Sequence, residues 1–99
     1  MKQLFTVTAF LFSVTLFAQI RGKITDKAGN PVPYTTVMIE HTYNGTSAND
    51  NGHYELSVKE KGTYTVIFQS LGYKTKKVTK DVQQLPYTID VTLEDENYT

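Results

Sequence analysis

Only a few residues of this 99-residue chain have side chains suited to catalysis. Cys is absent, which removes disulfides, thiolate zinc ligands and cysteine nucleophiles together. The two histidines, His41 and His53, have serines and Asp50 nearby in sequence, but no nucleophile elbow or other known catalytic context surrounds them. No His-Glu-x-x-His pattern is present to bind zinc. The sequence therefore predicts a protein that is not an enzyme, with no catalytic, metal or cofactor site.

The segment from Asn49 to Gly52, with the sequence NDNG, has some likeness to a calcium-binding loop. It lacks the spaced carboxylates and the final bidentate Glu that such a loop requires. Asn, Asp and Gly tolerate positive φ, so we expect a plain turn. A second bend is expected at Gly72, which would let Tyr73 fold back over the end of the domain.

Tyrosines are the residues best suited to hold a ligand by contact, and the chain has seven of them. Exposed aromatic rings can stack on sugar rings. Tyr34, Tyr43 and Tyr73 lie in or near predicted loops and are the candidate ligand contacts. Tyr54 and Tyr64 alternate with core positions, so we expect these two to pack inside the domain.

A run of lysines near the end of the chain has two interpretations. Lys74, Lys76, Lys77 and Lys80 could contact anionic lipid headgroups or lipopolysaccharide. They could instead lie on an edge strand, where lysine discourages pairing with a second sheet, and we favour this interpretation. Ten basic residues balance ten acidic ones over the whole chain. This balance argues against a nucleic-acid partner, which requires a basic face.

The first 18 residues differ from the rest of the chain. Lys2 is their only charge, residues 4–17 are uncharged and largely apolar, and small Ala18 precedes polar Gln19. This pattern is typical of a secretory signal peptide over residues 1–18, and the apolar run is shorter than the roughly 20 residues that span a membrane. We expect an exported protein in the periplasm, at the outer membrane or on the cell surface, with no transmembrane span after cleavage. An uncleaved N-terminal anchor is the alternative.

The remaining chain alternates apolar and polar residues with a period of two, which predicts short β-strands. Turn clusters separate them, including a predicted hairpin turn at 60–62. Each strand has one apolar face, so two sheets must pack these faces together. We expect an all-β, seven-stranded, two-sheet sandwich over residues 19–94 and a loose polar tail at 95–99. The expected strands cover residues 20–24, 35–40, 46–48, 53–58, 63–69, 73–78 and 86–93.

The order and spacing of several short motifs carry a resemblance to a known family. The motifs are IRGKITD at 20–26, GNPVPY at 29–34, GT at 45–46, NDNG at 49–52, GTY at 62–64 and FQSLGY at 68–73. Together they resemble the carboxypeptidase-regulatory-like (CarboxypepD_reg-like) domain. The resemblance implies a transthyretin-like (prealbumin-like) sandwich. It also implies the setting of such domains, which lie behind a signal peptide at the N-terminus of Bacteroidetes outer-membrane proteins, many of them TonB-dependent receptors.

Two functions follow as expectations. The first is a non-catalytic accessory or binding module of an exported envelope protein, associated with a TonB-dependent outer-membrane receptor or a similar machine. Its partner would be an outer-membrane protein or the remainder of a longer chain. The alternative is a stand-alone secreted domain that binds a glycan or a peptide through its tyrosine-rich loops.

Overall fold

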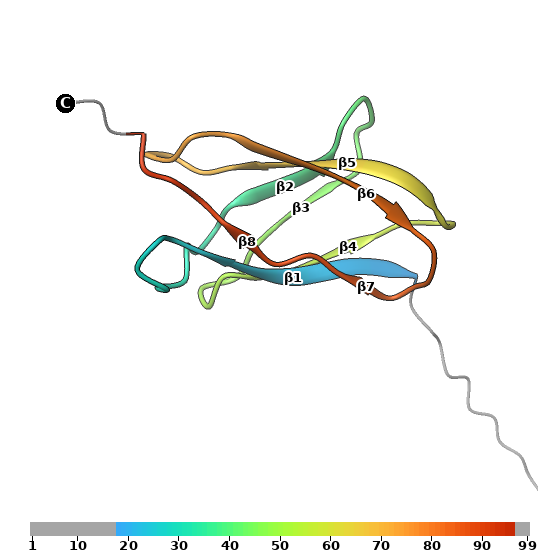
Figure 1. The fold of residues 1–99 in the computed structure, drawn as a ribbon, viewed down its shortest axis with the longest axis horizontal. Helices are drawn as coiled ribbons and strands as arrows, with labels where there is room; N and C mark the ends of the chain where they lie inside the picture. The colour runs from blue at the N-terminus through green and yellow to red at the C-terminus, as the bar shows by residue number, and fades with distance from the viewer. Residues whose placement is uncertain (1–17, 97–99) are drawn as a thin grey trace, which may run out of the picture.

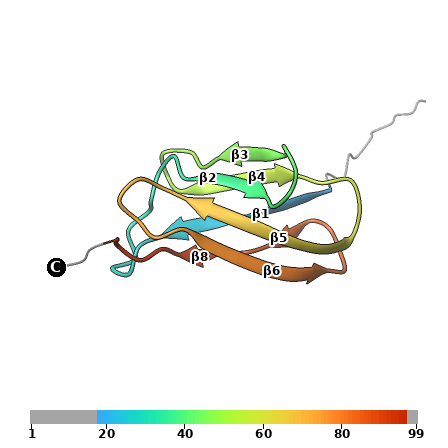
Figure 2. The same cartoon turned by 90° about the horizontal axis from the view of Figure 1, so that it is seen from above.

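The computed structural model of the chain describes residues 18–96, which form two facing β-sheets (Figure 1). One sheet has the strand order β4-β1-β7, with β8 also paired to β1, and the other has the order β3-β2-β5-β6. Figure 2 shows the second sheet lying over the first. The expected all-β, two-sheet sandwich is confirmed. The strands are β1 (Gln19–Thr25), β2 (Thr36–Ile39), β3 (Gly45–Ser47), β4 (His53–Ser57), β5 (Gly62–Gln69), β6 (Lys76–Val82), β7 (Tyr87–Thr88) and β8 (Val91–Thr92).

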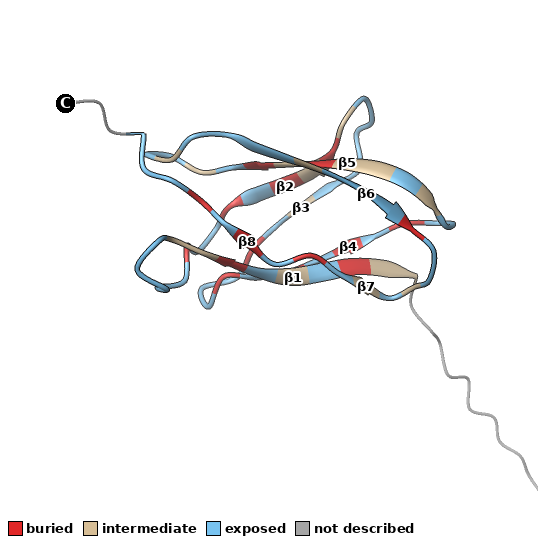
Figure 3. Ribbon diagram, viewed as in Figure 1, coloured by how far each residue is buried: buried red, intermediate tan, exposed pale blue. Residues whose placement is uncertain are grey.

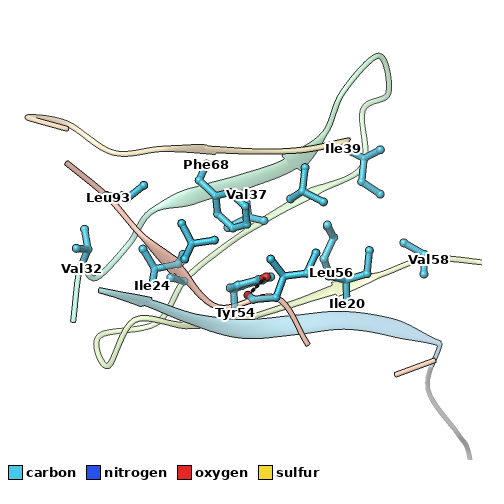
Figure 4. Packing of buried hydrophobic residues seen from close by; sticks show 14 of the residues in the cluster. Ile20, Ile24, Val32, Val37, Ile39, Tyr54, Leu56, Val58, Phe68 and Leu93 are labelled. Carbon is cyan, nitrogen blue, oxygen red and sulfur yellow. Dashed lines mark hydrogen bonds between the residues drawn. The ribbon is translucent and has the colours of Figure 1, made fainter. Parts of the chain in front are cut away.

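Alternation along the strands builds the core between the sheets (Figure 3). In β4, Tyr54 and Leu56 are buried, whereas His53, Glu55 and Ser57 are exposed. The rings of Tyr54 and Phe68, one from each sheet, meet edge to face with centroids 5.5 Å apart (Figure 4). Burial of this apolar surface is the main favourable contribution to folding. The buried hydrophobic residues among those described are Ile20, Ile24, Val32, Val37, Ile39, Ala48, Tyr54, Leu56, Val58, Val66, Phe68, Val82, Ile89, Val91 and Leu93.

The connection between β4 and β5 differs from the predicted hairpin. Residues 60–62 were expected to join two neighbouring strands, but β4 pairs with β1 while β5 pairs with β2 and β6. The prediction of a hairpin turn at this position is wrong. The Glu-Lys-Gly sequence specifies a chain reversal, and it carries no information about which sheet the next strand joins. Here the chain crosses from one sheet to the other.

The last expected strand is split into β7 and β8. Both pair in parallel with β1, but Ile89 and Asp90 between them leave the regular ladder. The Ile89 N–H donates to the Arg21 carbonyl at 2.8 Å, and the Lys23 N–H donates to the Asp90 carboxylate at 2.9 Å. The cause lies in Gly22, because a Cβ there would stand 2.0 Å from the Ile89 carbonyl oxygen. The missing side chain lets the Ile89 carbonyl approach β1, and the ladder is interrupted here with no change of register. Sequence alternation alone did not predict this interruption.

The C-terminal segment is attached to the domain as far as Glu96. The Lys74 N–H donates to the Glu94 carbonyl at 2.8 Å, and the Glu96 N–H donates to the Gly72 carbonyl at 2.9 Å. Residues 95 and 96 therefore pair with the β5–β6 turn, in contrast to the loose tail that we expected from residue 95. The same pairing removes residues 73–75 from the sixth strand, so β6 starts at Lys76 and not at Tyr73.

The predicted signal peptide lies outside the described residues, apart from Ala18. Within residues 18–96, no helix has the length and hydropathy to cross a membrane.

Candidate binding surface at one end of the sandwich

The loops of the sandwich lie at two opposite ends, and the strand register determines which loops share an end. Residues 26–35, 48–52, 70–75 and 93–96 form one end, which we call the Leu71 end. Residues 40–44, 58–61 and 83–86 form the other, which we call the Tyr43 end. The three predicted ligand contacts divide between these two ends.

Tyr34 is held outward at the Leu71 end. Its side chain is 67% exposed, and its backbone has a φ of 60°, a left-handed conformation that costs a non-glycine residue about 1–2 kcal/mol. The flanking residues fix this conformation. Val32 and Thr35 are buried, the Thr35 hydroxyl donates to the Val32 carbonyl at 3.2 Å, and the Ala48 N–H donates to the Thr35 carbonyl at 2.8 Å. The Tyr34 ring therefore faces solvent because its neighbours are anchored in the core.

Leu71 is at the same end of the sandwich as Tyr34 and was missed by sequence reasoning. It is 99% exposed and sits in the turn that the Tyr73 N–H closes on the Ser70 carbonyl at 3.1 Å. The β2–β5 ladder ends at the pair Thr36–Gln69, so Tyr34, two residues before Thr36, and Leu71, two residues after Gln69, both lie beyond this end of the ladder. The available sequence signal was an apolar residue next to Gly72, inside a turn.

The other two candidate tyrosines do not join this surface. Tyr73 is half-buried and packs against the core, as expected for a residue that folds back after Gly72. Tyr43 is fully exposed in the β2–β3 turn, at the Tyr43 end. Tyr34 precedes β2 and Tyr43 follows it, so the two tyrosines lie beyond opposite ends of this short strand. One ligand of modest size therefore cannot contact both.

The Leu71 end carries an excess of acidic groups. It holds two lysines and five carboxylates: Lys27, Lys74, Asp26, Asp50, Glu94, Asp95 and Glu96. Lys27 and Lys74 both approach the Glu94 carboxylate, at 4.0 and 3.6 Å. One oxygen of the Asp26 carboxylate accepts the N–H groups of Ala28 and Asn30, each at 2.9 Å.

The remaining three carboxylates at this end, those of Asp50, Asp95 and Glu96, have no ion-pair partner among residues 18–96. All three residues are exposed. The free charge of the Leu71 end is therefore negative. The Tyr43 end differs, because its loops contain two lysines, Lys59 and Lys61, and two glutamates, Glu40 and Glu60.

A shallow open hollow of about 320 Å³ lies on the outer face of the β4–β1–β7 sheet. Its polar and charged lining residues are Arg21, Lys23, His53, Glu55, Thr88 and Asp90. Tyr54 also borders the hollow, but its side chain is only 2% exposed and its hydroxyl donates to the Ile89 carbonyl at 2.6 Å. Burial, with a smaller contribution from the Asp90 charge, raises the pKa of Tyr54. This phenol is therefore a neutral structural donor.

The histidines and the lysine run also have defined places. His41 contacts the Glu40 carboxylate at 2.9 Å at the Tyr43 end, whereas His53 begins β4 near the other end. The structure therefore does not bring the two histidines together. β6, which carries Lys76, Lys77 and Lys80, is an edge strand, in agreement with the favoured interpretation of the run.

The NDNG segment forms the expected plain turn. The Asn49 side-chain oxygen accepts the N–H groups of Asn51 at 2.8 Å and His53 at 3.0 Å. Both hydrogen bonds lie within the turn, so this oxygen stabilises the turn itself. Gly52 has a φ of 80°, as predicted, and a Cβ there would stand 2.6 Å from the Ile24 carbonyl oxygen. Within residues 18–96, no three His, Asp or Glu side chains are grouped so that they could hold a metal ion.

These observations define a small β-sandwich module that exposes Tyr34 and Leu71 at one loop end and Tyr43 at the other. The chain belongs to the CarboxypepD_reg-like domain family, whose sequence profile matches residues 20–99. The resemblance seen in the sequence motifs is therefore confirmed.

Similar proteins come from a virus and from a cohesin–dockerin assembly. Structural protein 27 of a virus (isolate Australia/Victoria) is 30% identical over 74 residues, and the match covers 75% of this chain but only 14% of the viral protein. Chains in two crystal structures of type II cohesin–X-dockerin complexes of Acetivibrio cellulolyticus share the fold. One has a TM-score of 0.68 at 18% identity, covering 79% of this chain and 58% of that one. The other has a TM-score of 0.57 at 20% identity, covering 76% and 52%.

Proposed function

We propose that this domain is a non-catalytic accessory module of an exported envelope protein, and that it docks a partner protein through the Leu71 end. The observation that carries the proposal is the placement of Tyr34 and Leu71. Both are large side chains with apolar surface exposed at the same end of the domain, and exposed apolar surface that gathers in one region marks contact sites.

The finer parts of the proposal concern location and partner. The apolar N-terminal segment ending at Ala18 supports export, and family membership supports an accessory role beside a larger protein. In this proposal the partner is a TonB-dependent outer-membrane receptor or a similar envelope protein. The viral relative is named a structural protein, and the solved neighbours are named as complexes, so both names are compatible with a role in assembly.

Site-specific cross-linking in the producing cell tests this function. A photoreactive phenylalanine analogue would replace Leu71 in one sample and Tyr43 in a second, matched sample. We expect position 71 to cross-link to an envelope protein identified by mass spectrometry, and we expect position 43 to give far less of the same product. Equal cross-linking at both positions, or cross-linking to cytoplasmic proteins alone, would contradict the proposal.

The same samples also test export. Mass spectrometry of the purified chain should give Gln19 as its first residue, and fractionation should place the chain with periplasmic or outer-membrane proteins. A chain that retains Met1 and fractionates with the cytoplasm would contradict export.

The alternative, glycan binding by ring stacking, makes a different prediction. It requires Tyr34, Tyr43 or Tyr73 to contact a sugar ring, and only Tyr34 and Tyr43 are well exposed. Binding to a polysaccharide panel that is lost in Tyr34→Ala and kept in Leu71→Ala would favour this alternative over protein docking.

A further inference from the structure

Three carboxylates at the Leu71 end have no ion-pair partner among residues 18–96, and their positions indicate which charge a partner protein should carry. Asp50 lies in the loop at 48–52, and this loop packs on residues 31–35. A Cβ on Gly52 would stand 3.2 Å from the Pro31 Cβ, and the Ala48 N–H donates to the Thr35 carbonyl. Asp50 therefore lies on the Tyr34 side of the apolar pair.

Asp95 and Glu96 lie on the other side of the pair. Asp95 forms an antiparallel bridge with Tyr73, and the Glu96 N–H donates to the Gly72 carbonyl at 2.9 Å. Both residues are therefore next to the turn that carries Leu71. Acidic residues therefore occur in the loop that packs on the Tyr34 segment and in the segment that pairs with the turn of Leu71.

The two lysines of this end offset only part of the charge of its five carboxylates. Lys27 and Lys74 both lie against the Glu94 carboxylate, as described above. The arrangement of an apolar centre with a charged, solvent-accessible rim is the usual anatomy of a protein interface. Rim charges select partners of opposite charge and repel those of like charge.

Building on the proposed function, we propose that the Leu71 end docks a polypeptide surface with an apolar centre and a basic rim. Tyr34 and Leu71 would fill the apolar centre of the contact. Asp50 on one side, with Asp95 and Glu96 on the other, would face lysine or arginine side chains of the partner. The charge-balanced Tyr43 end lacks this arrangement and serves as an internal control.

Two synthetic peptides test the inference on the purified, ¹⁵N-labelled full chain. Both peptides share one Leu-Phe-Leu centre, flanked on each side by lysines in the first and by glutamates in the second. Amide chemical shifts are followed during titration. We expect the basic peptide to shift amides around Tyr34, Asp50 and residues 70–73, with roughly tenfold tighter binding than the acidic peptide, the ratio that about three exposed ion pairs give.

Variants separate the apolar centre from the rim. Leu71→Ala should weaken the binding of both peptides. The triple variant Asp50→Asn, Asp95→Asn and Glu96→Gln should remove the preference for the basic peptide. Tyr43→Ala should change neither. Because all of these side chains are exposed, the amide spectrum of each variant should show an unchanged fold.

The outcomes distinguish this inference from the function on which it rests. Equal binding of both peptides at the Leu71 end would overturn the basic-rim inference and leave docking at this end intact. Shifts confined to the Tyr43 end or to a sheet face, or no shift with either peptide, would overturn the inference and also count against docking through Leu71. Addition of salt should weaken the basic peptide selectively, because exposed charges are screened.

Discussion

At the scale of single residues, Gly22 and Tyr54 depend on each other across the β1–β4 ladder, where they are register partners. The absence of a side chain on Gly22 lets the Ile89 carbonyl approach β1. This carbonyl then accepts the Tyr54 hydroxyl at 2.6 Å, so neither buried polar group is left without a partner (Figure 4). The sequence predicted Tyr54 as a packing residue, but its hydrogen bond joins residues 35 positions apart and had no local signal.

Replacement of Gly22 by alanine should destabilise the domain. The new Cβ would lie 2.0 Å from the Ile89 carbonyl oxygen and 2.7 Å from the carbonyl carbon, so the backbone itself must move. We expect a loss of about 3 kcal/mol, at the upper end for overpacked cores, in urea denaturation followed by circular dichroism. The control is Arg21→Ala, an exposed change in the same strand, which should stay within about 0.5 kcal/mol. A Gly22→Ala chain as stable as this control would show that the close approach of the Ile89 carbonyl to Gly22 has no steric role.

Replacement of Tyr54 by phenylalanine should cost about 1–3 kcal/mol at neutral pH, because the buried Ile89 carbonyl loses its donor. The measurement is again urea denaturation. Tyr64→Phe is the matched control, because its hydroxyl donates to the exposed Glu60 carbonyl, where water can replace it. Equal losses in the two variants would contradict a special contribution from the buried bond.

Tyr54 also predicts a dependence on alkaline pH. Burial, followed by the Asp90 charge, raises the pKa of this phenol above its ordinary value of 10.0. The unfolded chain therefore releases the proton above pH 10 while the folded chain keeps it. This contribution to stability is complete below pH 10 and is lost as the pH rises toward the folded pKa. The free energy of unfolding should fall more steeply above pH 10 in the natural chain than in Tyr54→Phe, and parallel curves would contradict this.

At the scale of the elements, β6 shows how an edge strand is kept from pairing with other chains. Val78 and Val82 point toward the core, so Lys76 and Lys80, two positions apart from them, lie on the same face. The Lys76 ammonium lies 3.5 Å from the Thr92 carbonyl on the facing sheet. Lysines that point inward at an edge oppose the approach of a second sheet.

Removal of these two charges should promote association. In Lys76→Val combined with Lys80→Val, the edge becomes apolar, and we expect larger species than the natural chain forms in size-exclusion chromatography with light scattering. The control is Lys59→Val combined with Lys61→Val, which removes the same number of positive charges from the connection between β4 and β5. It should leave the elution unchanged. Identical elution of both double variants would mean that the inward lysines have no protective role.

The β4 edge is protected by a different means. The His53 carbonyl accepts the Asn49 N–H at 2.8 Å, and the Ser57 carbonyl accepts the Asn44 side-chain amide at 2.6 Å. Sequence reasoning found Asn49 as a turn residue. The use of both asparagines at the outer edge of β4 became visible only once the strands were placed in their sheets.

At the scale of the whole molecule, the C-terminal segment links the two sheets. β8 pairs with β1 in one sheet, and residues 94–96 pair with the turn that leads into β6 in the other. A chain ending at Leu93 should lose about 1–3 kcal/mol of stability, because two backbone bonds are removed. Hydrogen exchange at the Lys74 amide should also become faster. A chain ending at Glu96 is the control, since it keeps both bonds, and equal exchange rates in the two would contradict the link.

The parts of the architecture that sequence predicted are those set by neighbouring residues. Alternation identified the buried face of β4 and β5, and turn chemistry identified the bend at Gly52. The parts that it missed depend on distant contacts. These are the crossing at residues 60–62, the close approach of the Ile89 carbonyl to Gly22, and the exposure of Leu71.

The parallel pairing of β1 with β7 and β8 has a mechanical consequence. The described chain enters at β1 and leaves just after β8, so tension applied through its two ends pulls these neighbouring strands in opposite directions along their length. The backbone hydrogen bonds from Ile89 to Arg21 and from Leu93 to Thr25 are then loaded together in shear. In a hairpin pulled open from its end, such bonds would instead break one at a time. We therefore expect the module to resist tension between its two ends more strongly than a hairpin that opens from one end.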